Sequence, residues 1–155
     1  MKINFKISYF YQIRNFKPNQ LPVSTALWDP KWYHENKDQN HIFVDKNGVL
    51  NGLRIPELSP IQASGCGECT DKNPEVCQFM KQYKEQLENT DFYEIIYKLT
   101  DYAKKYLRWA IEGDIILIVH EAPTNPCSER AALQEYFDRF GYDLPEFRKD
   151  DNNEC

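Results

Sequence analysis

Apolar and polar side chains alternate near the start of the chain, from Ile3 to Tyr9. A period of two is typical of a strand with one buried face, so we expect a strand over residues 3–9. A second short strand is expected over Leu21–Leu27, because Trp28-Asp29-Pro30 carries turn residues that would end it. The run Ile115–Val119 is continuously apolar and rich in β-branched residues. That pattern predicts a strand covered on both faces.

Three later segments have apolar residues at helical spacing. The first follows Asn73-Pro74, a pair that suits the N-cap and the first position of a helix. The second starts near Asp91, with Glu94 three residues later as in a capping box. The third begins at Asn125-Pro126 by the same capping argument and ends at Gly141. This order of strands and helices predicts one α/β domain, a three-layer Rossmann-like fold with a mostly parallel sheet and flanking helices.

From about Trp28 to Asn73 the sequence is irregular. It contains a short apolar run, His41–Val44, followed by turn signals at Asp45-Lys46-Asn47-Gly48. Because so long a segment without periodicity is uncommon in a compact domain, we expect it to be a functional excursion or to be held by other means. We expect a single domain over residues 1–148 and a frayed tail over residues 149–155.

Composition and charge narrow the class of protein. The 155 residues suit one domain, and the 41% of them that are hydrophobic exclude a disordered chain. The net charge of −5 disfavours non-specific nucleic-acid binding, although it leaves a local basic pocket open. The first residues lack the apolar core of a signal peptide and no run is long enough to span a membrane, so we expect a cytoplasmic protein. In that reducing compartment the five cysteines are more often metal ligands, reactive thiols or buried fillers than disulfides.

The loop after the third strand is the strongest candidate for a functional site, because ligands of parallel sheets gather at the carboxyl ends of the strands. A helix that starts at Asn125-Pro126 would place Cys127, Ser128 and Arg130 in its first turn. The positive end of the helix dipole would then favour the Cys127 thiolate. Arg130 could grip a phosphate or a carboxylate with two hydrogen bonds.

From their spacing alone, a purely structural interpretation of the same residues is the commoner one. A lone cysteine in a first turn is commonly a small apolar filler, and Glu121 could pair with Arg130 simply to hold the loop. Under the functional interpretation, Cys127, Arg130 and Glu121 are candidate catalytic residues, with Asn125 and Ser128 as candidate ligand-binding residues.

The stretch from Ile115 to Gln134 resembles the C-terminal signature of the domain-of-unknown-function family 488. Residues 7–10, 22–32 and 51–54 resemble the front half of a subgroup frequent in bacteria and their phages. The resemblance implies an α/β domain without an established activity. The commoner family signature after the strand is Cys-His-Arg, whereas this chain has Cys127-Ser128-Glu129-Arg130. With that histidine missing, His120 or Glu121 could take its place as a base.

A cysteine cluster offers a separate chemistry. Cys66 and Cys69 form a Cys-x2-Cys pair, and Cys77 follows eight residues later in the first turn of the expected helix. Three thiolates can converge on one tetrahedral ion, so a structural zinc is one interpretation; free thiols or a redox pair are the others. Zinc would need a fourth ligand, for which the candidates are Cys127, His41, His120 and Cys155.

Aromatic and charged residues follow the second strand. If that strand lies beside the third, its end would bring Trp28 and Asp29 to the same crevice, with Trp32 and Arg54 close in sequence. An aromatic face there could stack a base or a sugar. Alternatively, the two tryptophans anchor the irregular segment to the core.

These observations leave two main hypotheses for function. The first is an enzyme acting on a nucleotide or another phosphate-bearing small molecule through a Cys/Arg site at a helix N-terminus. The second is a non-catalytic module, stabilised by cysteine-ligated zinc, that binds a nucleotide, a nucleic-acid end or a protein. A thiol-redox protein is a third and needs accessible Cys66 and Cys69.

Overall fold

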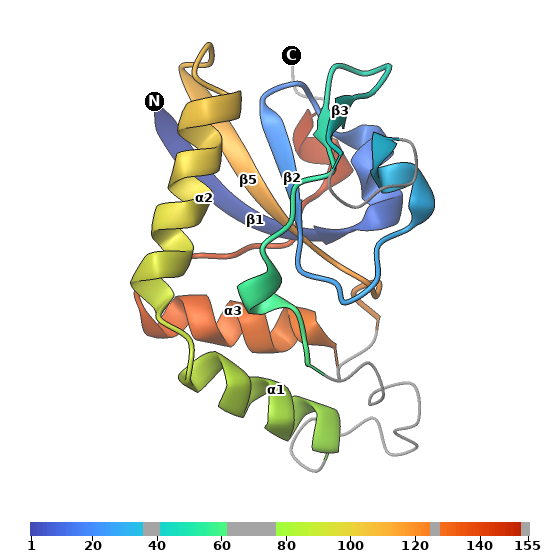
Figure 1. The fold of residues 1–155 in the computed structure, drawn as a ribbon. Coiled ribbons are helices and arrows are strands. Elements are labelled where there is room, and N and C mark those ends of the chain that lie inside the picture. The colour runs from blue at the N-terminus through green and yellow to red at the C-terminus, as the bar shows by residue number, and fades with distance from the viewer. Residues whose placement is uncertain (36–40, 62–76, 125–127, 153–155) are drawn as a thin grey trace.

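A computed structural model describes residues 1–35, 41–61, 77–124 and 128–152. Within them the chain is a mixed α/β protein built on a parallel sheet with strand order β1-β5-β2 (Figure 1). The strands are β1 (Lys2–Tyr9), β2 (Gln20–Ser24) and β5 (Glu112–Val119). The three predicted strands are therefore confirmed, and their parallel pairing brings their carboxyl ends to one edge of the sheet.

The central strand is β5, and all of its residues from Gly113 to Val119 are buried. Ile115 and Leu117 face one side of the sheet and Ile116 and Ile118 the other, so both faces are covered as the sequence predicted. The second strand ends at Ser24, three residues earlier than expected. The Ser24 Oγ accepts a hydrogen bond from the Ala26 backbone N–H, which turns the chain away from the sheet.

Three α-helices cover the face that Ile115 and Leu117 share, and together they form the larger core. They are α1 (Gln78–Glu88), α2 (Phe92–Tyr106) and α3 (Glu129–Arg139). Asp91 caps α2 as predicted, because its carboxylate accepts hydrogen bonds from the backbone N–H groups of Tyr93 and Glu94. None of the described helices is long and apolar enough to cross a bilayer.

The other two helices begin later than the sequence predicted. The first helical residue of α1 is Gln78, preceded by an extended Cys77, and not Pro74. The first helical residue of α3 is Glu129, preceded by an extended Ser128, so the expected start at Asn125-Pro126 is wrong. Ser128 and Glu129 are both buried, and tertiary packing of this kind overrides a local capping signal. Cys127, which the sequence placed in that first turn, lies outside the described residues.

The opposite face of the sheet is covered by short 3-10 segments instead of α-helices. They are η1 (Phe10–Asn15), η2 (Lys31–Tyr33) and η6 (Lys149–Asn152), and they enclose a smaller core around Ile116 and Ile118. Within the predicted tail, the Asn152 amide donates to the Asn15 backbone oxygen, which ties η6 to η1.

The irregular segment is held by a hairpin and by one bridge to the sheet. The hairpin pairs β3 (Phe43–Val44) with β4 (Leu50–Asn51). Its turn is built on Asp45, whose carboxylate accepts the backbone N–H groups of Asn47 and Val49, and Gly48 has the positive φ of 80° that the turn needs. Arg54 then bridges to the end of β2, and η4 (Pro56–Leu58) leads away from it.

Candidate functional site

Polar side chains meet at the carboxyl edge of the sheet, where β2 and β5 end beside the start of α3. Ser24 and Thr25 come from the end of β2, Glu121 follows β5, and Glu129 and Arg130 belong to the first turn of α3. This edge is the usual ligand position in parallel α/β sheets. The predicted residues Glu121 and Arg130 therefore lie at this edge, which the sequence pointed to.

Asp29 forms the centre of a buried polar network after β2. Its carboxylate is fully buried and accepts the Ser24 hydroxyl, while its Oδ2 lies 2.7 Å from His34 Nε2 and 3.2 Å from Arg54 Nε. Arg54 also donates through Nη2 to the Ala26 backbone oxygen at 2.8 Å. The network ties the irregular segment to the end of β2, which is a structural task.

This network is not arranged for acyl transfer. A Ser-His-Asp triad needs the histidine between the serine and the carboxylate, so that it can take the serine proton. Here Asp29 lies between Ser24 and His34, so the serine proton points to a carboxylate. His34 Nδ1 is buried and has no hydrogen-bond partner within the described residues.

The two tryptophans are exposed. Trp28 is 69% exposed and has no ring partner in the described part of the chain. Trp32 is 53% exposed, and its ring packs edge-on against Phe10 and Tyr33. Asp29 therefore does not act together with the two tryptophans, because its carboxylate points inward while both indoles stay accessible to solvent.

Arg130 is nearly buried and is held by internal partners. Its Nε donates to Glu146 at 2.5 Å, and its Nη1 donates to the Glu121 backbone oxygen at 2.7 Å. The Nη2 group lies 3.4 Å from the second Glu146 oxygen, so three of the guanidinium's roughly five N–H groups are used. Glu146 is bridged to β1 at Ile7. Arg130 therefore links the start of α3 to the C-terminal segment and to the sheet.

Glu129 is the most unusual titratable group at this edge. Burial, reinforced by the nearby negative charge of Glu121, raises the pKa of this carboxyl to about 8. A Thr25 hydroxyl that donates to the ionised carboxylate, the charge of Arg130 and the His120 backbone N–H all favour ionisation, but they do not overcome the effect of burial. Near neutral pH the side chain is therefore mostly a neutral acid that can donate or accept a proton.

The hydrogen bonds of Thr25 agree with a protonated Glu129. The Thr25 hydroxyl lies 3.0 Å from the Ile118 backbone oxygen and 3.1 Å from Glu129 Oε2. A hydroxyl has one hydrogen to donate, and the Ile118 oxygen can only accept. Both contacts are satisfied at once when Glu129 supplies the second hydrogen. An ionised Glu129 would compete with Ile118 for the single Thr25 proton.

Ser128, beside this acid, has an unused hydroxyl. It precedes α3 in the N-cap position, yet its side chain caps no backbone N–H of the helix. The Oγ is buried and has no hydrogen-bond partner among the described residues. A buried hydroxyl without a partner at a helix N-terminus is a place where a polar ligand atom would be stabilised.

No protein-family model, curated protein or solved structure matches this chain. The resemblance to the domain-of-unknown-function family 488 therefore stays a prediction from the sequence. The site has to be interpreted from its own geometry.

Four residues of the predicted sites, Cys66, Cys69, Asn125 and Cys127, lie outside the described residues. Cys77 is described and is buried directly before α1. Among the described residues no three His, Cys, Asp or Glu side chains gather closely enough to hold a metal ion. The zinc site and the thiolate site therefore both stay predictions.

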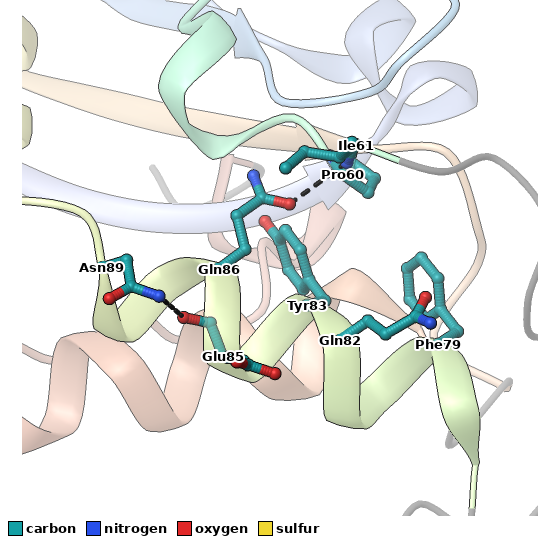
Figure 2. Close-up of a pocket in the computed structure, with 8 residues that line it drawn as sticks. All are labelled: Pro60, Ile61, Phe79, Gln82, Tyr83, Glu85, Gln86 and Asn89. Carbon is teal, nitrogen blue, oxygen red and sulfur yellow. Dashed lines mark hydrogen bonds between the residues drawn. The ribbon is translucent and has the colours of Figure 1, made fainter.

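A separate pocket of about 350 Å³ lies between α1 and the segment that follows η4 (Figure 2). Two of its polar side chains are engaged within the protein: Gln86 accepts the Ile61 backbone N–H and donates to the Ser59 oxygen, and Asn89 donates to the Glu85 backbone oxygen. Tyr83 points toward the η4 side, where its hydroxyl donates to the Leu58 oxygen. We assign no ligand to this pocket, because Gln86, Asn89 and Tyr83 hold α1 and the segment after η4 together.

Sequence patterns did not indicate Glu129, the residue at this edge whose pKa is most shifted. An acidic residue in a first helical turn is common and usually exposed, so Glu129 carried no signal of its own. The one available clue was its place beside Ser128 and Arg130 in the signature segment. His34 and Glu146 were missed for a similar reason, because their partners are distant in sequence or in an irregular segment.

Proposed function

We propose that this protein is an enzyme that acts on a nucleotide or another phosphate-bearing small molecule at the carboxyl edge of its sheet. The observation that carries the proposal is the buried Glu129, whose pKa of about 8 suits a group that gives and takes a proton near neutral pH. Perturbed carboxyls of this kind cluster at functional sites. Glu129 also belongs to the first turn of a helix, and the N-terminus of a helix favours a bound anion such as phosphate.

The other groups of the edge have defined roles in this proposal. Ser128 offers its unpartnered hydroxyl to the ligand. Arg130 acts mainly as a positioning residue, because Glu146 and the Glu121 backbone oxygen hold it in place. Cys127 remains the proposed nucleophile on the strength of the sequence alone. The proposed fold class is the Rossmann-like arrangement, with 3-10 segments as its second outer layer.

The alternative is a non-catalytic binding module with a structural zinc. The observation in its favour is that Arg130 and Asp29, both proposed as ligand-binding or catalytic from the sequence, have their charges satisfied within the protein. A buried ion pair of this kind often serves the fold. Cys66, Cys69 and Cys77 would supply the zinc ligands in this alternative.

The two functions are separated by a turnover experiment. The purified protein is incubated with a panel of nucleoside mono-, di- and triphosphates and sugar phosphates, and conversion is followed by phosphorus and proton NMR. We expect conversion of at least one compound, with a rate that falls by about 100-fold or more in Glu129→Gln. The matched control is Glu135→Gln, in the same helix but half exposed and paired with Lys84.

An unchanged rate in Glu129→Gln would remove Glu129 from the mechanism. Binding of a panel compound without any conversion, together with one equivalent of zinc by elemental analysis, would instead support the non-catalytic module.

A further inference from the structure

A large open cleft lies on the face of the sheet that the α-helices do not cover. Its volume is about 970 Å³, and it is formed by η1, by Trp32 of η2 and by the β3-β4 hairpin. Asn47 spans it at one end, where its amide donates to the Arg14 backbone oxygen. Both η1 and η2 follow carboxyl ends of parallel strands, β1 and β2 respectively, which is the side of the sheet where ligands collect.

Exposed aromatic rings line this cleft. Trp32 is 53% exposed, but Phe10 and Tyr33 fix its orientation through edge-on contacts at 6.2 and 6.3 Å between ring centroids. Tyr11 is 57% exposed and stacks on Tyr9. A rigid, half-exposed indole is a preformed platform, because stacking a flat ligand on it costs little further ordering of the protein.

The cleft is lined by two cationic side chains and one acidic side chain, so its net charge is positive. Arg14 and Lys46 are exposed at its rim, and neither forms an ion pair within the part of the chain that the structure describes. The acidic residue of the lining, Asp45, has its carboxylate engaged by the Asn47 and Val49 backbone N–H groups and by the Asn51 amide. In a protein of net charge −5, two cations beside an aromatic platform form a local basic pocket.

A row of aromatic rings and guanidinium groups in contact connects the cleft to the predicted catalytic edge. The Arg130 guanidinium lies 5.8 Å from the centre of the Tyr9 ring, Tyr9 and Tyr11 stack with centroids 6.4 Å apart, and Arg14 lies 3.8 Å over Tyr11. Contacts of this kind favour cations on aromatic faces. They place Arg14 and Arg130 at opposite ends of one continuous stack.

We propose that this cleft binds a mononucleotide, with the base stacked on Trp32 and the phosphate beside Arg14 and Lys46. The inference goes beyond the proposed function, because the cleft is a binding site of its own, and its Arg14 lies at the far end of the stack from Arg130. A neutral sugar would use the indole but not the two cations. An inorganic phosphate would use the cations but not the indole. Long nucleic acid fits poorly, because the acidic chain repels a phosphate backbone beyond the cleft.

The test measures the binding of AMP by isothermal titration calorimetry, with adenosine, ribose 5-phosphate and the hexanucleotide rA6 as comparison probes. We expect AMP to bind more tightly than adenosine and more tightly than ribose 5-phosphate. Trp32→Ala should weaken AMP by about 5- to 150-fold, the range expected for loss of one base stack. Trp32→Phe should keep part of the affinity, which separates lost stacking from lost folding.

Matched controls come from the same chain. Trp109 is 63% exposed on the loop between α2 and β5 and does not line the cleft, so Trp109→Ala should leave AMP binding unchanged. Lys46→Ala should weaken the binding of AMP and reduce the salt dependence of that binding, while the binding of adenosine stays unchanged. Lys17→Ala removes an exposed lysine outside the lining, so it should change neither the affinity for AMP nor its salt dependence.

Several results would overturn the proposal: equal affinity for AMP and ribose 5-phosphate, an effect of Trp109→Ala as large as that of Trp32→Ala, or tighter binding of rA6 than of AMP. The last result would assign the cleft to single-stranded nucleic acid. Glu129→Gln should bind AMP like the wild type. If Glu129→Gln loses turnover but still binds AMP, the result supports both the proposed function and the proposed cleft. If the wild type converts a non-nucleotide phosphate but does not bind AMP, only the proposal for the cleft is refuted.

Discussion

Replacement of Glu129 by glutamine tests whether a protonated acid is built into the start of α3. Glutamine has the shape of the protonated side chain. Its amide N–H₂ can donate to the Thr25 hydroxyl, and its oxygen can accept the His120 backbone N–H that the carboxyl accepts. We therefore expect Glu129→Gln to match the wild-type free energy of unfolding near pH 5 to within about 1 kcal/mol.

The two proteins should diverge as the pH rises. The pKa of Glu129 is raised from 4.5 to about 8 in the folded protein, so between these values the unfolded chain ionises while the folded chain keeps its proton. The folded state then binds more protons, and the stability of the wild type falls with increasing pH. At about 1.4 kcal/mol per pKa unit the full loss is about 5 kcal/mol, of which roughly 3 to 4 kcal/mol falls between pH 5 and pH 8. Glu129→Gln lacks this loss.

The assay is urea-induced unfolding of both proteins from pH 5 to pH 8.5, compared at each pH so that the other titrating groups cancel. Glu135→Gln is the control, because Glu135 is about half exposed on the same helix and should give a nearly constant difference from the wild type. Parallel pH profiles for the wild type and Glu129→Gln would refute the reasoning, since they would mean that Glu129 titrates in the folded protein as it does in the unfolded chain.

Three further substitutions test the contacts that position the site. Arg130→Ala should lower the free energy of unfolding by about 3 to 5 kcal/mol, because it leaves the half-buried Glu146 unpaired, and adding Glu146→Gln should recover part of the loss in a double-mutant cycle. Asp29→Asn should cost about 3 kcal/mol in chemical unfolding, because the buried Arg54 contact loses its countercharge; a cost below 0.5 kcal/mol would contradict a structural network. Asp91→Ala should cost about 1 kcal/mol by removing the cap of α2, with asparagine retaining most of the stability.

The regular elements could be predicted because each depends on a local pattern. The alternation of apolar and polar residues predicted β1, and a continuous β-branched run predicted β5. A single capping residue, Asp91, predicted the start of α2. Such patterns act over a few residues, so the sequence displays them directly. The starts of α1 and α3 escaped prediction, because Cys77 and Ser128 are buried in extended conformations that packing imposes against the local capping signals.

The candidate site was only partly accessible to the same reasoning. The sequence pointed to the end of β5 and to Arg130, and it pointed to Trp32 as a stacking residue, since these lie beside recognisable elements. It did not indicate that Arg130 pairs with Glu146, that His34 bonds Asp29, or that Arg14 and Lys46 border the cleft with Trp32. Those pairs depend on which segments cover the second face of the sheet, and that face is built from irregular chain without a periodic signal.

Sequence alone determined that this protein has a parallel sheet flanked by helices, and it predicted a functional site where β2 and β5 end. Tertiary structure alone decided the protonation of that edge. Whether a glutamate is an ordinary surface charge or a neutral acid near pH 7 depends on its distance from water and on its hydrogen-bond partners. For Glu129 those partners include Thr25, which lies 104 residues away in the chain and beside it only in the fold.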